Sequence, residues 1–134
     1  MLKSVLFDID GTITDTNPIF LDAIIQTHFE MTGQLKNREF FHFSLGIPSP
    51  VTMRILDIPQ GKRMLYIQRW QEHIKEKMHE VVLFPGIVTV LENLREWGLS
   101  MALVTSKIRS EFSFQFESFG LNHFFQTVIC ADDA

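Results

Sequence analysis

A short apolar run near the start of the chain breaks into an acidic glycine turn, and this motif constrains the fold more than any other stretch. Residues 5–7, Val-Leu-Phe, are typical of a buried strand, and Gly11 lets the backbone leave that strand sharply. Asp8 and Asp10 lie one residue apart, so in extended backbone their side chains point to the same side. Two ionised carboxylates this close repel each other unless a cation neutralises them or one holds a proton.

A hard, oxygen-seeking cation such as Mg²⁺ satisfies this pair, because it binds carboxylates, waters and substrate phosphate oxygens. Such a site combines a metal-activated nucleophile with an acid–base partner. The alternative is that Asp8 begins an ordinary acidic turn and Asp10 initiates a helix, since Asp and Gly are common in turns. The position of the motif straight after an apolar run favours the functional interpretation.

Composition and charge limit the classes of function. The chain has 134 residues, of which 46% are hydrophobic and 21% charged, as in a packed globular domain. Its net charge of −4 argues against nucleic acid or an anionic membrane as the main partner. Cys130 is the single cysteine, which excludes an intramolecular disulfide. Because we also find no signal peptide and no apolar run near the ~20 residues of a membrane span, we expect a cytoplasmic protein.

The spacing of apolar residues predicts a parallel sheet interrupted by a helical insertion. Between residues 16 and 82 the pattern is helical or irregular, with no convincing strand. Alternation of strands and helices implies right-handed crossovers and a parallel sheet. The strands are expected at residues 4–8, 100–104 and 127–131, with helical spacing between the later strands at residues 88–94 and 108–118.

Polar clusters follow each of the three predicted strands. In parallel sheets, ligands bind at the carboxyl ends of the strands, so we expect Asp8, Asp10 and Thr105 to lie close together. The clusters are Asp8 with Asp10, Thr105 with Ser106 and Lys107, and Asp132 with Asp133.

Each later cluster also has a simpler interpretation. Thr105 and Ser106 are residue types that often cap a following helix. We interpret Lys107 as a solvated or phosphate-attracting charge and not as a catalytic base. Asp132 and Asp133 are also consistent with an acidic tail.

The motifs resemble those of the haloacid dehalogenase-like hydrolases, in the branch with a helical cap inserted after the first strand. Phe-Asp-Ile-Asp-Gly-Thr at residues 7–12 is similar to the first motif of that family, and Leu-Val-Thr-Ser at residues 103–106 to the second. Within the family the chain most resembles phosphoglycolate phosphatases and their pyrophosphatase relatives, which carry a similar Thr-x-Lys after the second strand. Residues 13–16 are also similar to the equivalent run of β-phosphoglucomutases.

This resemblance implies an α/β fold with a Rossmann-like three-layer core around a parallel sheet. Residues 1–15 and 83–134 would form that core and residues 16–82 an α-helical cap. The family continues with a lysine motif, a further acidic motif and two more strands, so we expect a truncated chain whose core lacks its C-terminal part. The first strand would then have an open edge, through which we expect self-association.

The resemblance also implies a role for each residue of the site. Asp8 would be the nucleophile that forms an aspartyl-phosphate, and Asp10 the general acid and then the general base. Mg²⁺ would bind the Asp8 carboxylate and the Asp10 backbone carbonyl. Phosphate would be held by the remaining motif residues, Gly11, Thr12, Thr105, Ser106 and Lys107.

The implied function is Mg²⁺-dependent hydrolysis of a small phosphorylated metabolite, either phosphoglycolate-like or pyrophosphate. Two alternatives stay open from the sequence. One is a catalytically incomplete phosphate-binding or regulatory fragment that needs a partner to finish its sheet. The other is a phosphosugar mutase, in which the phosphoryl group passes to a sugar and not to water.

Overall fold

The computed structural model describes residues 1–133, which divide into two compact units. The first, here called the sheet unit, joins Met1–Asp15 to the segment from Val82 onwards. The second, here called the helical unit, is Thr16–Val81. Within residues 1–133, no helix is both long enough and apolar enough to cross a membrane.

A parallel three-stranded sheet organises the sheet unit, which confirms the predicted α/β class. The strands β1 (Ser4–Phe7), β2 (Ser100–Val104) and β3 (Thr127–Ile129) lie in the order β1-β2-β3. Helix α5 (Ile87–Glu96) precedes β2, and helix α6 (Arg109–Phe116) connects β2 to β3. Short 3-10 turns cover Glu117–Phe119, Asn122–Phe124 and Ala131–Asp133.

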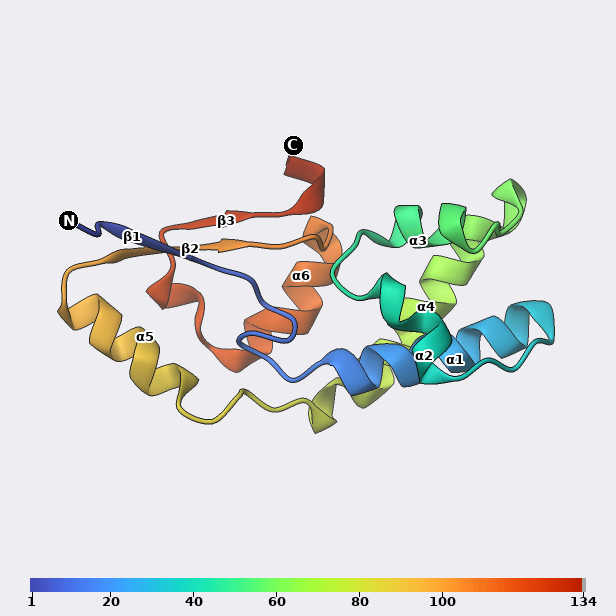
Figure 1. Cartoon of the computed structure of the whole chain (residues 1–134), viewed down its shortest axis with the longest axis horizontal. Coiled ribbons are helices and arrows are strands. Elements are labelled where there is room, and N and C mark those ends of the chain that lie inside the picture. Colours follow the sequence, from blue (N-terminus) through green and yellow to red (C-terminus); the bar gives the residue numbers. More distant parts are fainter. Residues whose placement is uncertain (134) are drawn as a thin grey trace. The chain divides into compact units, whose positions relative to one another are not determined.

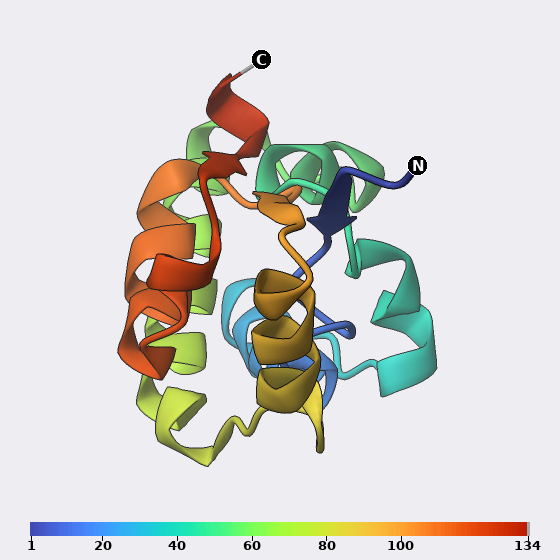
Figure 2. The same cartoon turned by 90° about the vertical axis from the view of Figure 1, so that its left-hand side faces the viewer.

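Both helices of the sheet unit pack on one face of the sheet (Figure 1 and Figure 2). Leu91 of α5, Leu103 of β2 and Phe116 of α6 are fully buried in one shared core. Right-handed crossovers that advance in the same direction across a sheet place their helices on the same side. Within residues 1–133 the sheet unit therefore shows the sheet and one helical layer of the expected Rossmann-like core.

The opposite face of the sheet is apolar and exposed. Alternate residues of a strand point to opposite faces, so Leu6 and Val104 point away from the helices. Leu6 is 68% exposed, and Val104 and Ile129 are exposed as well. Because β2 is the central strand, β1 and β3 are the edge strands of the sheet that residues 1–133 form.

Four helices build the helical unit, with α1 (Asn17–Thr32) packed along α4 (Arg63–Lys77). The shorter helices are α2 (Arg38–Phe41) and α3 (Ser49–Ile55). Gly33 ends α1 in the left-handed conformation and donates its N–H to the Phe29 carbonyl. Further 3-10 turns cover His42–Ser44, Gln60–Lys62 and Met78–Glu80.

A buried polar pair crosses the core of the helical unit. His28 of α1 and Tyr66 of α4 share a hydrogen bond of 2.9 Å between Nδ1 and the phenolic oxygen. Burial lowers the pKa of His28, because desolvation disfavours the imidazolium, and the nearby charge of Lys36 acts in the same direction. The pair thus fixes the contact between the two long helices, and burial disfavours the charged form of His28.

We predict that the helical unit loses stability as the pH falls below the unfolded-state histidine pKa of about 6.5. The folded-state pKa of His28 is lower, so the unfolded chain binds the proton more readily and acid favours unfolding. Urea unfolding between pH 5 and 8, followed by the fluorescence of buried Trp70 in a Trp97→Phe background, measures this slope. His28→Gln should flatten it, whereas His79→Gln, at an exposed position, should not. An unchanged slope in His28→Gln would contradict the prediction.

Candidate functional site

The loop after β1 folds back on itself, and its two carboxylates differ in exposure to solvent. Asp8 is exposed, whereas the Asp10 side chain is only 14% exposed. Buried Ile9 and Ile13 anchor the loop in the core of the sheet unit. The Ile9 carbonyl accepts hydrogen bonds from the next turn of backbone: Thr12 N at 3.1 Å, Ile13 N at 2.8 Å and Thr14 N at 3.2 Å.

Gly11 makes this tight loop possible. Its φ of 78° lies in the left-handed region, where a side chain is disfavoured. Its N–H donates to the Thr14 carbonyl at 2.9 Å and closes the loop. Thr12 lies exposed beside it on the same turn.

The segment after β2 forms a second turn, which is joined to the end of β3. Buried Thr105 donates its N–H to the Ile129 carbonyl at 2.9 Å, and its hydroxyl accepts from Lys107 N at 3.2 Å. The Lys107 carbonyl accepts from Ala131 N at 2.8 Å. Helix α6 begins only at Arg109, and its N-cap residue is Ile108, so the capping interpretation of Thr105 and Ser106 is wrong.

Both turns leave the sheet at the same edge. The register pairs Phe7 with Leu103, so Asp8 follows one member of that pair directly and Thr105 lies two residues beyond the other. The carboxyl edge of a parallel sheet is where ligands bind in this class of fold. Loops far apart in sequence therefore present the Asp8–Asp10 and Thr105–Lys107 segments at one place.

Lys107 is buried, which overturns its interpretation as a solvated charge. Its ammonium lies 2.7 Å from Asp10 Oδ2, and its side chain is 6% exposed. The ammonium also donates to Oε1 of Gln115, a buried residue of α6. Sequence reasoning missed Gln115, which lies near the C-terminal end of the adjoining helix α6.

Asp132 and Asp133 hold the end of β3 against the start of α6. Asp132 Oδ1 accepts from Arg109 N at 2.9 Å. Asp133 Oδ2 accepts from Cys130 N at 2.7 Å and pairs with the Arg109 guanidinium. These carboxylates therefore have a structural role, and the interpretation as an acidic tail is wrong.

The donor set of the loop after β1 fits a magnesium ion that also binds substrate. Among residues 1–133, no three side chains of His, Cys, Asp or Glu gather as ready metal ligands. Mg²⁺, however, keeps several waters and commonly uses one or two carboxylates together with substrate phosphate. The exposed Asp8 carboxylate is a ligand of this kind, and the Asp10 backbone carbonyl is the second ligand that the resemblance implies. The Asp10 carboxylate is paired with Lys107 instead.

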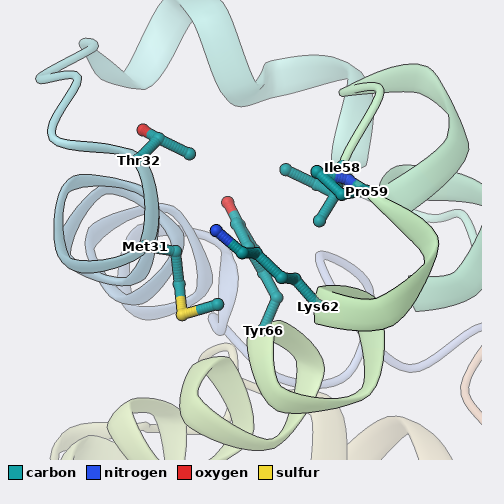
Figure 3. Close-up of a pocket in the computed structure, with 6 residues that line it drawn as sticks. All are labelled: Met31, Thr32, Ile58, Pro59, Lys62 and Tyr66. Atoms are coloured by element: carbon teal, nitrogen blue, oxygen red, sulfur yellow. The ribbon is translucent and has the colours of Figure 1, made fainter.

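The helical unit contains a separate cavity of about 260 Å³ (Figure 3). The Tyr66 hydroxyl and the Lys62 ammonium provide polar groups among apolar walls. None of the residues that line the cavity belongs to the site predicted from the sequence. The lining residues are Met31, Thr32, Ile58, Pro59, Lys62 and Tyr66.

Comparison with known sequences identifies the family. Residues 5–134 match the family model described as haloacid dehalogenase-like hydrolase. The chain is 32% identical over 133 residues to pyrophosphatase PpaX of Oceanobacillus iheyensis and 29% identical over 135 residues to PpaX of Bacillus velezensis. Each alignment covers 98% of this chain and 61% of the relative. The chain therefore belongs to the haloacid dehalogenase-like hydrolase family and spans about 61% of the length of these curated relatives.

Solved structures share the fold. A hydrolase from Pseudomonas syringae superposes with a TM-score of 0.87 at 20% identity, over 98% of this chain and 62% of that chain. A predicted phosphoglycolate phosphatase from Haemophilus somnus gives a TM-score of 0.81 at 17% identity, over 99% of this chain and 64% of that chain. These similarities establish the architecture and not the substrate.

We predict that Gly11→Ala destabilises the protein by about 1–2 kcal/mol, because an L-residue with a side chain pays this cost in the left-handed region. The matched control is Gly61→Ala, at a glycine without a positive φ, where an added methyl group would meet open space. The free energy of unfolding from urea denaturation followed by circular dichroism compares the two variants. Equal stability of Gly11→Ala and the parent protein would show that the loop adopts another conformation.

Proposed function

We propose that the chain carries the nucleophile and phosphate-binding site of a Mg²⁺-dependent phosphatase acting on a small phosphorylated metabolite. The observation that carries the proposal is the placement of Asp8 and Asp10 beside the Thr105 turn, at the carboxyl edge of a parallel sheet, in a member of this hydrolase family. The pyrophosphatase names of the relatives support pyrophosphate as the substrate. A phosphoglycolate-like ester is the other substrate that the resemblance implies.

Asp8 and Asp10 divide the chemistry between them. An Asp8 carboxylate oxygen attacks phosphorus, and the bond between phosphorus and the leaving oxygen breaks as that oxygen takes a proton from Asp10, which enters this step in its protonated form. In the second half, Asp10 accepts a proton from the water that attacks the aspartyl-phosphate. Phosphate then leaves and the Asp8 carboxylate is regenerated.

The neighbouring turns supply donors for the phosphate oxygens. Thr105 and Ser106 lie after β2, and Gly11 and Thr12 lie on the loop after β1. The Asp8 carboxylate and the Asp10 carbonyl would hold Mg²⁺, whose charge offsets that of the phosphate.

A second candidate function is phosphate binding without full catalytic activity. The exposed apolar face and the open edges of the sheet favour it. Exposed Leu6 and Val104 on that face and the unpaired side of β1 are surfaces that a packed core normally covers. Under this proposal the 134-residue chain binds phosphate but turns over poorly until its sheet is completed.

We predict that Asp8→Asn abolishes turnover in the protein expressed from its complete gene, because an amide does not attack phosphorus. Asp10→Asn should slow turnover by about 10²–10⁴-fold, the usual contribution of general acid–base catalysis. Phosphate release from pyrophosphate and 2-phosphoglycolate, with Mg²⁺ and after chelation, measures both effects. Chelator-resistant turnover, or full activity of Asp8→Asn, would overturn the phosphatase assignment. A wild-type chain that phosphate and Mg²⁺ stabilise against heat without any turnover would support the second candidate.

We also propose that the 134-residue chain self-associates through the open edge of β1. An edge strand offers unpaired N–H and C=O groups, and the 68% exposed Leu6 lies on that strand. Sedimentation velocity over a concentration series should therefore show reversible dimers or larger species. Leu6→Lys should shift the equilibrium to monomer, whereas Val90→Lys, at an exposed position on α5, should not. A monomeric parent chain at all concentrations would refute this proposal.

A further inference from the structure

We propose that Lys107 is a positioning residue that, braced by Gln115, aims the Asp10 carboxylate for proton transfer. This inference rests on the proposed function of Asp10 as general acid and base. It assigns a task to a buried charge that phosphate binding does not explain, because its ammonium is directed to Asp10.

Hydrogen bonds hold both the backbone and the side-chain ammonium of Lys107. Its backbone N–H is bonded to the Thr105 hydroxyl and its carbonyl to Ala131 N, so the main chain is fixed in the turn after β2. Its ammonium lies 2.7 Å from Asp10 Oδ2 and also donates to Gln115 on α6. The Asp10 side chain thus meets a cation anchored by three separate elements of the sheet unit.

The burial of the Lys107–Asp10 ion pair suits Lys107 to positioning the Asp10 carboxylate. Removing two charges from water carries a desolvation penalty that only close geometry and further hydrogen bonds offset. Lys107 and Gln115 are 7% and 3% exposed, so neither side chain has room to adopt many rotamers. Holding Oδ2 of Asp10 fixes the plane of its carboxylate and therefore the direction of Oδ1. A general acid must lie within hydrogen-bonding reach of the leaving oxygen, and small misplacements cost rate.

Gln115 is matched to this task because its amide is neutral. Its oxygen orients the ammonium without competing for the charge that Lys107 shares with Asp10. A hydrophobic side chain of similar size would remove this oxygen from the ammonium. Gln115→Leu should therefore reproduce a weaker form of the Lys107 effect.

The test compares two phosphate esters that differ in their need for an acid. p-Nitrophenyl phosphate releases a stable anion without protonation, whereas an alkyl phosphate such as 2-phosphoglycolate requires a proton on its leaving oxygen. In the protein expressed from its complete gene, Lys107→Met should lower kcat/KM for the alkyl ester by about 10²-fold, the scale of a misplaced catalytic group. For the aryl ester kcat/KM should change little. Lys3→Met, at an exposed lysine of the sheet unit, is the matched control.

A double-variant cycle separates positioning from independent roles. If Lys107 acts through Asp10, adding Lys107→Met to Asp10→Asn should slow the alkyl ester no further. The losses of thermal stability should be non-additive as well. In the parent protein, Lys107→Met leaves the Asp10 carboxylate without its cation, whereas in the Asp10→Asn background there is no carboxylate to leave unpaired. Lys107→Arg should restore part of the lost rate by returning the charge.

Other outcomes would overturn the inference in distinguishable ways. If Lys107→Met lowers kcat/KM equally for both esters, Lys107 has a structural role. If it raises KM for both esters and leaves kcat unchanged, Lys107 binds phosphate. Additive effects in the double variant indicate that Lys107 and Asp10 act separately. In each of these cases the proposed phosphatase function stands. Wild-type protein that hydrolyses neither ester would overturn the proposed function, and the positioning role with it.

Discussion

The parallel pairing of β1 with β2 is the interaction on which the candidate site depends. Its register sets Phe7 opposite Leu103, so the acidic loop and the Thr105 turn leave the sheet together. A slip of one residue would exchange the faces of a strand and expose the side chains that now pack under α5 and α6. The hydrophobic pattern that builds the core therefore also aligns the two halves of the site.

The third strand contributes to the site indirectly. It brings no predicted catalytic residue, yet its end holds the Thr105 turn through Ile129 and Ala131 and holds the start of α6 through Asp132. These bonds fix the backbone on both sides of Lys107. Because the ammonium of Lys107 meets Asp10, the end of β3 helps to set the geometry of a carboxylate on the loop after β1.

Much of the fold could be predicted because its signals are local. The strand at Ser100–Val104 matches the expected bounds. The first and third strands are shorter than expected. After β3, residues Ala131–Asp133 turn into a 3-10 helix, and Ala131 donates its N–H to the Lys107 carbonyl in the turn after β2. The strand therefore ends where its partner segment has left the extended conformation, and the apolar spacing carries no signal of this.

The sequence by itself determined the order of strands and helices, the acidic loop after the first strand and the family resemblance. These depend on apolar periodicity and turn chemistry within short windows. Only the tertiary structure decided that Lys107 is buried against Asp10, that Gln115 braces it and that both helices share one face of the sheet. A lysine in a polar turn resembles a solvated charge until folding places a distant carboxylate beside it. Burial and pairing are properties of segments far apart in the chain, and no local pattern encodes them.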